Sequence, residues 1–288
     1  MNLFGNLDKI TYEGYINKFP FHLGLGINIE DYSKKLTEQT SLENFEGRAE
    51  NPLQKKVPKD IWSSVNPENK IPFPTELDDL IRLHYLVVSR KVTTILEFGV
   101  GKSTFVFDHA LAHNKIKFFS YVKQNLRRSN LMECHSLDNS KDWIKSCKKN
   151  FKTENVTYHL SKCRMGTFEG QACTFYDTVP NICPDLIYLD APDQFTPTGS
   201  IGGISTRHPD RMPMSGDILR FENFLLPGTL IVVDGRTANA RFIKNNLRRN
   251  WSYQYEEKYD QHFFELTEEP LGMFNKKQLE FSQDQKWD

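Results

Sequence analysis

Four acidic residues follow apolar segments of this 288-residue sequence and could share one site. They are Glu97, Asp138, Asp190 and Asp234. A carboxylate at the end of a buried strand can attract a cation, accept hydrogen bonds from ribose hydroxyls or act as a general base. Because parallel strands end at the same edge of a sheet, the four side chains are expected to gather there. A cation or a cationic cofactor would relieve their mutual repulsion.

A glycine turn, EFGVGKST, surrounds the first of these acids and separates an apolar run from a helical one. Gly99 and Gly101 let the backbone approach a ligand, and the helix start offers unpaired N–H groups. The letters GKST match the end of a P-loop, but Leu96 stands where a P-loop has its first glycine, which disfavours a nucleoside triphosphate. Thr104 stands where a dinucleotide site has its third glycine, so NAD is disfavoured but stays an alternative. A tight turn without a ligand, with Glu97 paired at the surface, is the remaining alternative.

The order of acid, apolar residue and two spaced glycines from Glu97 to Gly101 resembles motif I of the class I S-adenosylmethionine-dependent methyltransferases. Residues 185–192, DLIYLDAP, resemble the fourth-strand motif of that family. Residues 226–234, LPGTLIVVD, resemble its approach to the fifth strand, with Thr229 in place of a second glycine. The resemblance covers residues 75–266 and implies binding of S-adenosyl-L-methionine, whose α-amino group and sulfonium are cationic. The residues implied for cofactor binding are Glu97, Gly99, Gly101, Ser103, Asp138 and Asp190.

Asp138 is the candidate for the acid that binds the ribose hydroxyls at the end of the second strand. Such an acid is expected about 20 residues after the glycines, whereas Asp138 lies 39 positions after Gly99. The excess predicts an inserted segment near residues 116–130. Asp138, followed by Asn139 and Ser140, could instead cap the next helix, and both interpretations stay open.

Three aspartates, Asp190, Asp193 and Asp234, are spaced like the acidic ligands of metal-dependent O-methyltransferases. Their hard oxygen atoms would suit Mg²⁺, which could hold substrate oxygens and lower the pKa of a hydroxyl. The resemblance is incomplete, because Gly235 follows Asp234 where the family usually has a further Asn or Asp ligand.

Polar residues after the fourth strand supply the candidates for acceptor chemistry. Residues 194–206 carry no charge and are rich in Gly, Ser and Thr, which predicts a mobile lid. His208 could be a general base near neutral pH or an ordinary solvated loop histidine. Arg207, Arg211 and Arg236 could bind a substrate carboxylate or phosphate, or form ordinary salt bridges. The predicted catalytic residues are His208, Asp190 and Arg236.

The elements that must hold these residues alternate between strand and helix from residue 92 onward. Strands are predicted at 93–98, 131–137, 155–160, 185–190, 229–234, 252–258 and 262–266, and helices at 77–88, 102–113, 140–150, 217–225 and 238–250. This order predicts a Rossmann-like α/β three-layer sandwich, with a mostly parallel seven-stranded sheet and an antiparallel C-terminal hairpin strand. Residues 1–74 are predicted as a largely irregular N-terminal extension, 75–270 as a methyltransferase-like domain, and 271–288 as a loose C-terminal tail.

Composition limits the partners and the compartment. The 37 Lys and Arg residues balance 37 Asp and Glu residues, which argues against broad attraction to nucleic acid or to an anionic membrane. No apolar run reaches the ~18–20 residues that span a bilayer, and the first residues do not resemble a signal peptide. Five cysteines without a CxxC pair fit a reducing, cytoplasmic compartment and disfavour zinc at Cys163, Cys173 and Cys183.

Together these patterns predict an S-adenosylmethionine-dependent methyltransferase that acts on a hydroxyl of a small molecule or a sugar, with assistance by Mg²⁺ left open. The alternatives are an NAD-dependent oxidoreductase and a non-catalytic binding module with a methyltransferase-like fold. The N-terminal extension is the candidate for a contact between copies of the chain in a homo-oligomer.

Overall fold

The computed structural model describes residues 3, 12–18, 28, 30, 31, 34 and 77–284. Most of the predicted N-terminal extension, and with it the predicted oligomer contact, therefore lies outside the described residues. Within that part, helix α1 spans Tyr12–Lys18, and the Tyr15 hydroxyl contacts His84 Nδ1 at 2.5 Å.

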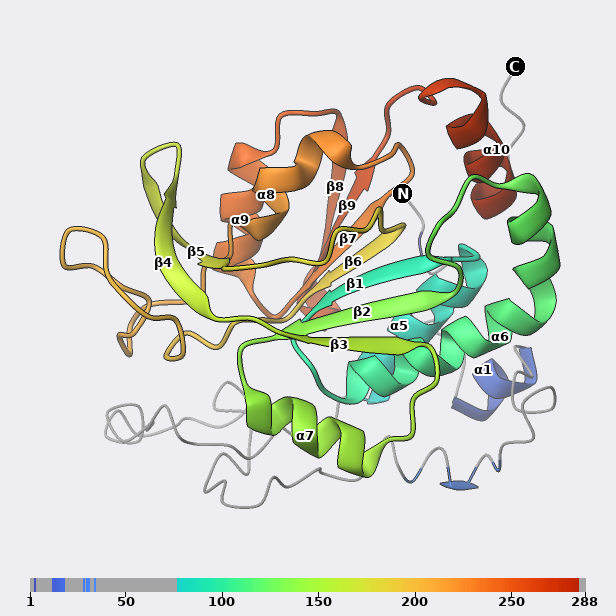
Figure 1. Cartoon of the computed structure of the whole chain (residues 1–288), viewed down its shortest axis with the longest axis horizontal. Helices are drawn as coiled ribbons and strands as arrows, with labels where there is room; N and C mark the ends of the chain where they lie inside the picture. The colour runs from blue at the N-terminus through green and yellow to red at the C-terminus, as the bar shows by residue number, and fades with distance from the viewer. Residues whose placement is uncertain are drawn as a thin grey trace.

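A seven-stranded sheet forms the centre of the molecule, with strand order β3-β2-β1-β6-β7-β9-β8 (Figure 1). The strands are β1 (Thr94–Phe98), β2 (Glu133–Asp138), β3 (Val156–Leu160), β6 (Leu186–Leu189), β7 (Leu230–Asp234), β8 (Trp251–Glu256) and β9 (Gln261–Leu266). All neighbouring pairs from β3 to β7 are parallel, whereas β9 runs antiparallel to both β7 and β8. The predicted Rossmann-like sheet with an antiparallel C-terminal pair is confirmed.

Helices cover both faces of the sheet, which gives three layers (Figure 1). One face carries α5 (Leu77–Ser89), α6 (Lys102–Asn125) and α7 (Lys141–Asn150), and the other carries α8 (Asp217–Phe221) and α9 (Thr237–Asn246). Alternate residues of each central strand enter opposite cores, as the pleat of a strand requires. In β1, for example, Ile95 packs in the core on the α5–α6 side, and Leu96 packs with Ile218 of α8.

Helix α6 is longer than the sequence pattern predicts. It continues to Asn125 instead of ending near His113, so most of the predicted insertion at 116–130 is a helical extension. Val122, Leu126 and Met132 form a small buried cluster at its end, and this packing stabilises the additional turns.

A two-stranded hairpin that the pattern did not predict connects β3 to β6. Its strands are β4 (Cys163–Phe168) and β5 (Gln171–Tyr176). Glu169 and Gly170 join them with φ angles of 49° and 80°, the left-handed values that suit a two-residue hairpin turn. A hairpin alone is marginal in water, and this one packs on α8, where the Arg220 guanidinium lies 3.3 Å from the centre of the Phe175 ring.

The C-terminal segment is a helix rather than a loose tail. Helix α10 spans Gly272–Gln283, and its Leu279 is only 2% exposed. Asn275 Nδ2 donates to Pro227 O at 3.2 Å, and Gln278 Nε2 donates to Asp185 Oδ1 at 2.8 Å. The prediction of a loose tail was wrong. The segment is polar in composition, so the few side chains that attach it to the domain, namely Leu279, Asn275 and Gln278, do not stand out in the sequence.

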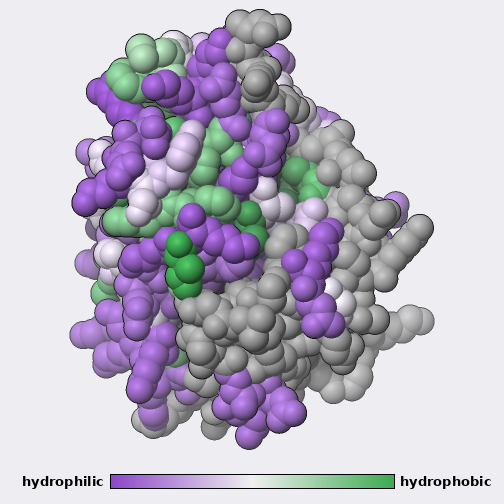
Figure 2. Space-filling view, turned by 90° about the vertical axis from the view of Figure 1, so that its right-hand side faces the viewer, coloured by the Kyte–Doolittle hydropathy of each residue, from purple (hydrophilic) through white to green (hydrophobic). Residues whose placement is uncertain are grey.

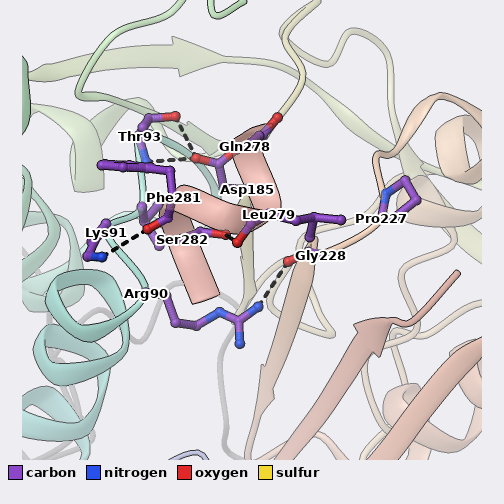
Figure 3. Close-up of a pocket in the computed structure, with 11 residues that line it drawn as sticks. Arg90, Lys91, Thr93, Asp185, Pro227, Gly228, Gln278, Leu279, Phe281 and Ser282 are labelled. Atoms are coloured by element: carbon purple, nitrogen blue, oxygen red, sulfur yellow. Dashed lines mark hydrogen bonds between the residues drawn. The ribbon is translucent and has the colours of Figure 1, made fainter. Parts of the chain in front are cut away.

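Helix α10 closes a small cavity at the amino ends of the strands (Figure 3). Thr93, Asp185 and Gly228 come from just before β1, β6 and β7, and Gln278 and Leu279 come from α10. This edge lies opposite the carboxyl ends of the strands, where ligands bind in open α/β sheets. The cavity therefore belongs to the packing of α10 and not to the predicted site.

The face of the molecule that carries α10 and the end of α6 is chemically mixed. Figure 2 shows a patchy band of apolar atoms surrounded by hydrophilic ones. Exposed apolar side chains on these elements and beside them include Ile116, Tyr121, Leu271, Met273 and Phe274. In the described part of the chain, no helix combines the length and the apolar character needed to cross a membrane.

Asp185 is expected to be important for stability, since it connects Arg128, the start of β1 and helix α10. It forms a salt bridge with Arg128 at 2.6 Å and accepts hydrogen bonds from Thr93 and from Gln278 of α10. Asp185→Asn leaves the buried Arg128 guanidinium without its carboxylate, so the free energy of unfolding is expected to fall by about 3 kcal/mol in urea denaturation. Asp177→Asn is the matched control, because its ion pair with Arg164 is exposed. Similar denaturation midpoints for the two variants would contradict the assigned role of Asp185.

Candidate functional site

The carboxyl ends of β1, β2, β6 and β7 lie side by side, as the sequence predicts. The register pairs Phe98 with Leu137 and with Leu189, and Leu189 with Val233. The residues that follow are tied across the edge, since Gly99 N donates to Leu137 O and Asp190 N donates to Phe98 O, both at 2.9 Å. This edge lies at the left of the sheet in Figure 1, where the hairpin β4–β5 and the β6–α8 loop also lie.

Glu97 is fully buried and is bound by three hydroxyl groups. Oε1 accepts a hydrogen bond from Ser103 at 2.6 Å, and Oε2 accepts from Thr104 at 2.7 Å and from Ser136 at 2.5 Å. Burial raises the pKa of Glu97 to about 7, although the three hydroxyls act in the opposite direction. The alternative of a surface ion pair for Glu97 is therefore wrong.

The two glycines of the turn have different roles. Gly99 has φ +106°, and a Cβ atom there would lie 3.0 Å from Asp190 O and 3.2 Å from Ala191 Cβ. It must be glycine because of both its backbone angle and this close approach. Gly101 has an extended φ of −173°, and a Cβ there would meet nothing within 4 Å. Open space at Gly101, at the start of α6, is what a ligand approaching the backbone requires.

Asp138 holds the glycine turn in place from the neighbouring strand. Its Oδ2 accepts from Val100 N at 3.0 Å and its Oδ1 accepts from Ser140 N at 2.6 Å. Burial raises the pKa of Asp138 to about 6. The N-cap of α7 is Ser140, whose hydroxyl accepts from Trp143 N, so Asp138 lies beside the helix start without being its cap.

Arg236 fixes the segment that follows β6. Its Nε donates to Asp190 Oδ1 at 3.1 Å, one terminal nitrogen donates to Asp190 O at 2.6 Å, and the other donates to Pro192 O at 2.7 Å. The guanidinium thus contacts the protein at all three nitrogens, which differs from the predicted role of binding a substrate anion. Asp190 keeps a half-exposed side chain, and its Oδ2 has no hydrogen-bond partner in the described part of the chain.

The predicted metal ligands do not form a metal centre. Asp190 pairs with Arg236, Asp193 Oδ1 accepts from Phe195 N at 2.9 Å, and Asp234 Oδ2 accepts from the Tyr188 hydroxyl at 2.7 Å. Within residues 77–284 and the few described residues before them, no three His, Cys, Asp or Glu side chains are grouped to hold a metal ion. The donor set does not fit Mg²⁺, since a cationic guanidinium already neutralises the first aspartate and the other two face different partners.

His208 is not part of the cluster at the strand ends. It is about half exposed in the β6–α8 loop, which extends away from the sheet at the left of Figure 1. Its Nδ1 accepts from Asp210 N at 3.1 Å, and its carbonyl accepts from Gln194. Arg211 donates within the same loop to Ser205 O. This structure therefore gives a catalytic role of His208 no support, and residues 194–206 contain turns and short bridges of their own.

The structure adds residues that the sequence analysis did not select. Ser136 and Thr104 donate two of the three hydroxyl hydrogen bonds to Glu97. Tyr176 of the hairpin packs on Phe98, with ring centroids 5.9 Å apart. Ser136 pairs with Glu97 in the register of β1 and β2. The register of β1 and β2 would have indicated Ser136 as a contact of Glu97. The sequence alone, however, does not show that these two strands are neighbours.

Comparisons with known proteins give structural similarities only. No family model matches the chain, and no curated protein matches it. An O-methyltransferase from Bacillus cereus in complex with S-adenosylhomocysteine aligns over 73% of this chain and 88% of its own, with 13% identity and a TM-score of 0.36. A methyltransferase from Podospora anserina bound to the same compound aligns over 84% and 97%, with 13% identity and a TM-score of 0.36. Human N-acetylserotonin methyltransferase in complex with S-adenosylmethionine aligns over 67% and 56%, with 11% identity and a TM-score of 0.33.

The strand order and directions decide the fold. Five parallel strands, with the first in the middle, are followed by an antiparallel pair in which the last strand inserts beside β7. The chain has a Rossmann-like α/β fold. Its glycine turn and the acids at the ends of β1, β2 and β6 occupy the edge at which Rossmann-like sheets bind their ligands.

Proposed function

We propose that this protein is an S-adenosylmethionine-dependent methyltransferase that methylates a hydroxyl of a small molecule or a sugar. The observation that carries this proposal is the buried carboxyl of Glu97 beside a glycine turn that is open at Gly101. A cationic ligand at this turn would stabilise the ionised forms of Glu97 and Asp138, whose pKa values burial raises to about 7 and about 6.

The residues present fit such a cofactor. Open space at Gly101 leaves room for the ligand at the start of α6, and Glu97 and Asp138 supply negative charge on either side of the turn. The cofactor would supply an activated methyl group that is transferred in one in-line displacement. The chain's own contribution is to bind and orient both reactants, and such alignment can lower a barrier by roughly 7–11 kcal/mol.

Asp190 is the proposed contact for the acceptor hydroxyl. Its half-exposed carboxylate follows β6 and is held by Arg236, which leaves Oδ2 available to accept a hydrogen bond from a hydroxyl. Arg236 is then a positioning residue that fixes the direction of this carboxylate. A net charge of zero supports a small acceptor over a nucleic acid or a membrane.

The dinucleotide alternative receives less support from the site. Thr104 stands at the position of the third glycine of a dinucleotide motif, and its hydroxyl donates to Glu97 and accepts from Gly101 N. Both hydrogen bonds of Thr104 hold the turn together. The glycine that a dinucleotide motif has at this position, for close packing of helix and strand, would lose both bonds.

Calorimetric titration of the wild-type protein with S-adenosylhomocysteine tests the proposed function. Saturable binding in the micromolar range is expected, and no binding at millimolar ligand would refute the proposal. A parallel titration with NADH, followed by fluorescence, checks the dinucleotide alternative. A methyl-transfer assay on hydroxyl acceptors then separates an enzyme from a binding module.

Methyl transfer is expected to be independent of divalent metal ions. The three aspartates that could have bound Mg²⁺ are committed to Arg236, to a backbone N–H and to Tyr188. Activity in an excess of EDTA should equal activity in Mg²⁺, as measured with a radiolabelled methyl donor. A loss of activity in EDTA that Mg²⁺ restores would show that the site rearranges to bind metal.

A further inference from the structure

Tyr176 is a buried residue with an unsatisfied polar atom at the edge of the proposed site. The side chain is 1% exposed, and its hydroxyl has no hydrogen-bond partner in the described part of the chain. A buried hydroxyl without a partner is costly, and most such groups in native proteins have a reason to be retained. Tyr176 is therefore unlike the buried Tyr188, whose hydroxyl donates to Asp234.

The hairpin fixes Tyr176 over the carboxyl end of β1. Tyr176 N donates to Asp217 Oδ1 at 3.0 Å, and Thr174 N donates to Met214 O, so the end of β5 is anchored to the start of α8. The ring packs on Phe98, the residue between Glu97 and Gly99. The hairpin thus places the aromatic ring of Tyr176, which carries the hydroxyl, against the residue before the glycine turn.

The carboxyl groups that affect the phenol include one that is already assigned to the cofactor. Burial raises the pKa of Tyr176, and the nearby carboxylates of Asp138 and Asp217 act in the same direction. The hydroxyl stays protonated at physiological pH, so it can both donate and accept a hydrogen bond. Tyr176 and Leu137 belong to the same buried cluster, and the residue after Leu137 is Asp138, the acid at the end of β2 that would bind ribose hydroxyls.

We propose that the Tyr176 hydroxyl binds the nucleoside part of the methyl donor, beside Asp138. This inference rests on the proposed function and adds a cofactor-binding residue to it. The hydroxyl is covered in this structure, so binding must shift the end of β5 or the Tyr176 ring slightly to expose it. The bound ligand then supplies the hydrogen-bond partner that the Tyr176 hydroxyl does not have in the described part of the chain.

Tyr176→Phe tests the proposal, because it removes only the hydroxyl. Affinity for S-adenosylhomocysteine and for 5′-methylthioadenosine, which lacks the amino-acid end, should each fall by about tenfold in calorimetric titration. The ligand-free variant should melt at the same or a higher temperature than the wild type, because an unpaired buried group has been removed. Tyr253→Phe is the matched control, since its hydroxyl contacts His262 Nδ1 at 3.0 Å in β9. This control should melt at a lower temperature and bind both ligands normally.

The outcomes separate this inference from the proposed function. If the wild type binds S-adenosylhomocysteine and Tyr176→Phe binds both ligands equally well, the inference is overturned and the proposed function stands. If Tyr176→Phe bound S-adenosylhomocysteine more weakly but 5′-methylthioadenosine normally, the contact would be with the amino-acid end of the ligand. That result would overturn the nucleoside assignment. A lower melting temperature for Tyr176→Phe would show that the hydroxyl has a partner in the protein, which also overturns the inference. Absence of binding by the wild type would refute the proposed function itself.

Discussion

Glu97→Gln is expected to weaken the binding of S-adenosylmethionine by about 10- to 100-fold at pH 8 and to remove most of its pH dependence. In the wild type, burial raises the pKa of Glu97 to about 7, so the ligand-free carboxyl is largely protonated at pH 6 and ionised at pH 8. A cationic cofactor binds the ionised form better, so wild-type affinity should rise by about tenfold from pH 6 to pH 8. Asp138 adds less to this rise, because its pKa is about 6. Calorimetric titration at several pH values measures both effects.

Glu97→Gln should weaken cofactor binding but raise the stability of the ligand-free protein above pH 5. A carboxyl with a pKa of about 7 in the folded protein and 4.5 as its ordinary value binds more protons when folded. Its contribution is therefore most favourable below pH 4.5 and is lost as the pH rises to about 7. Relative to the wild type, ligand-free Glu97→Gln should gain up to about 3 kcal/mol between pH 5 and pH 8 in urea denaturation.

Asp108→Asn is the control for this experiment. Asp108 is another buried carboxyl with a raised pKa, but its Oδ1 accepts from Glu154 N and Asn155 N at the turn before β3. The control should lower stability and leave the pH dependence of cofactor binding intact. If Glu97→Gln retained the wild-type pH dependence, Glu97 would not be the group that titrates on binding.

Gly99→Ala and Gly101→Ala are expected to separate stability from binding within one turn. Gly99→Ala should lower the free energy of unfolding by about 3 kcal/mol, because φ is +106° and the new Cβ would lie 3.0 Å from Asp190 O. Gly101→Ala should cost at most about 1 kcal/mol, since the backbone is extended and the Cβ meets nothing within 4 Å. The same Cβ would occupy the space proposed for the cofactor, so binding of S-adenosylhomocysteine should weaken by at least about tenfold.

Each variant of this pair serves as the control for the other, with urea denaturation and calorimetric titration applied to both. Normal binding by Gly101→Ala would show that the ligand does not approach this part of the turn. Wild-type stability of Gly99→Ala would contradict the close packing of the turn against the end of β6.

Much of the site could be predicted from local patterns. Apolar runs of five or six residues predicted the strands, and Glu97, Asp138 and Asp190 stood at the points where those runs end. Since parallel strands align their carboxyl ends, the patterns also predicted that these acids meet at one edge. The hairpin β4–β5 was missed because its polar and partly exposed strands lack a strong alternation, and the only local signal was the Glu169-Gly170 turn. Helix α10 was missed because a few anchors to distant residues, such as the bond of Gln278 to Asp185, stabilise it more than its own pattern suggests.

The sequence by itself therefore determined the order of the seven sheet strands and of the helices between them, the fold class and the position of the glycine turn, because these depend on periodicity and on residues close together in the chain. The tertiary structure decided the partner of each side chain. Ser136 reaches Glu97 from 39 positions away, and Arg236 reaches Asp190 from 46 positions away. Through such pairings Arg236 contacts the protein at all three guanidinium nitrogens, and each of the three predicted metal ligands has a partner of its own. Such pairings depend on which strands lie side by side and in what register, and no local pattern specifies that.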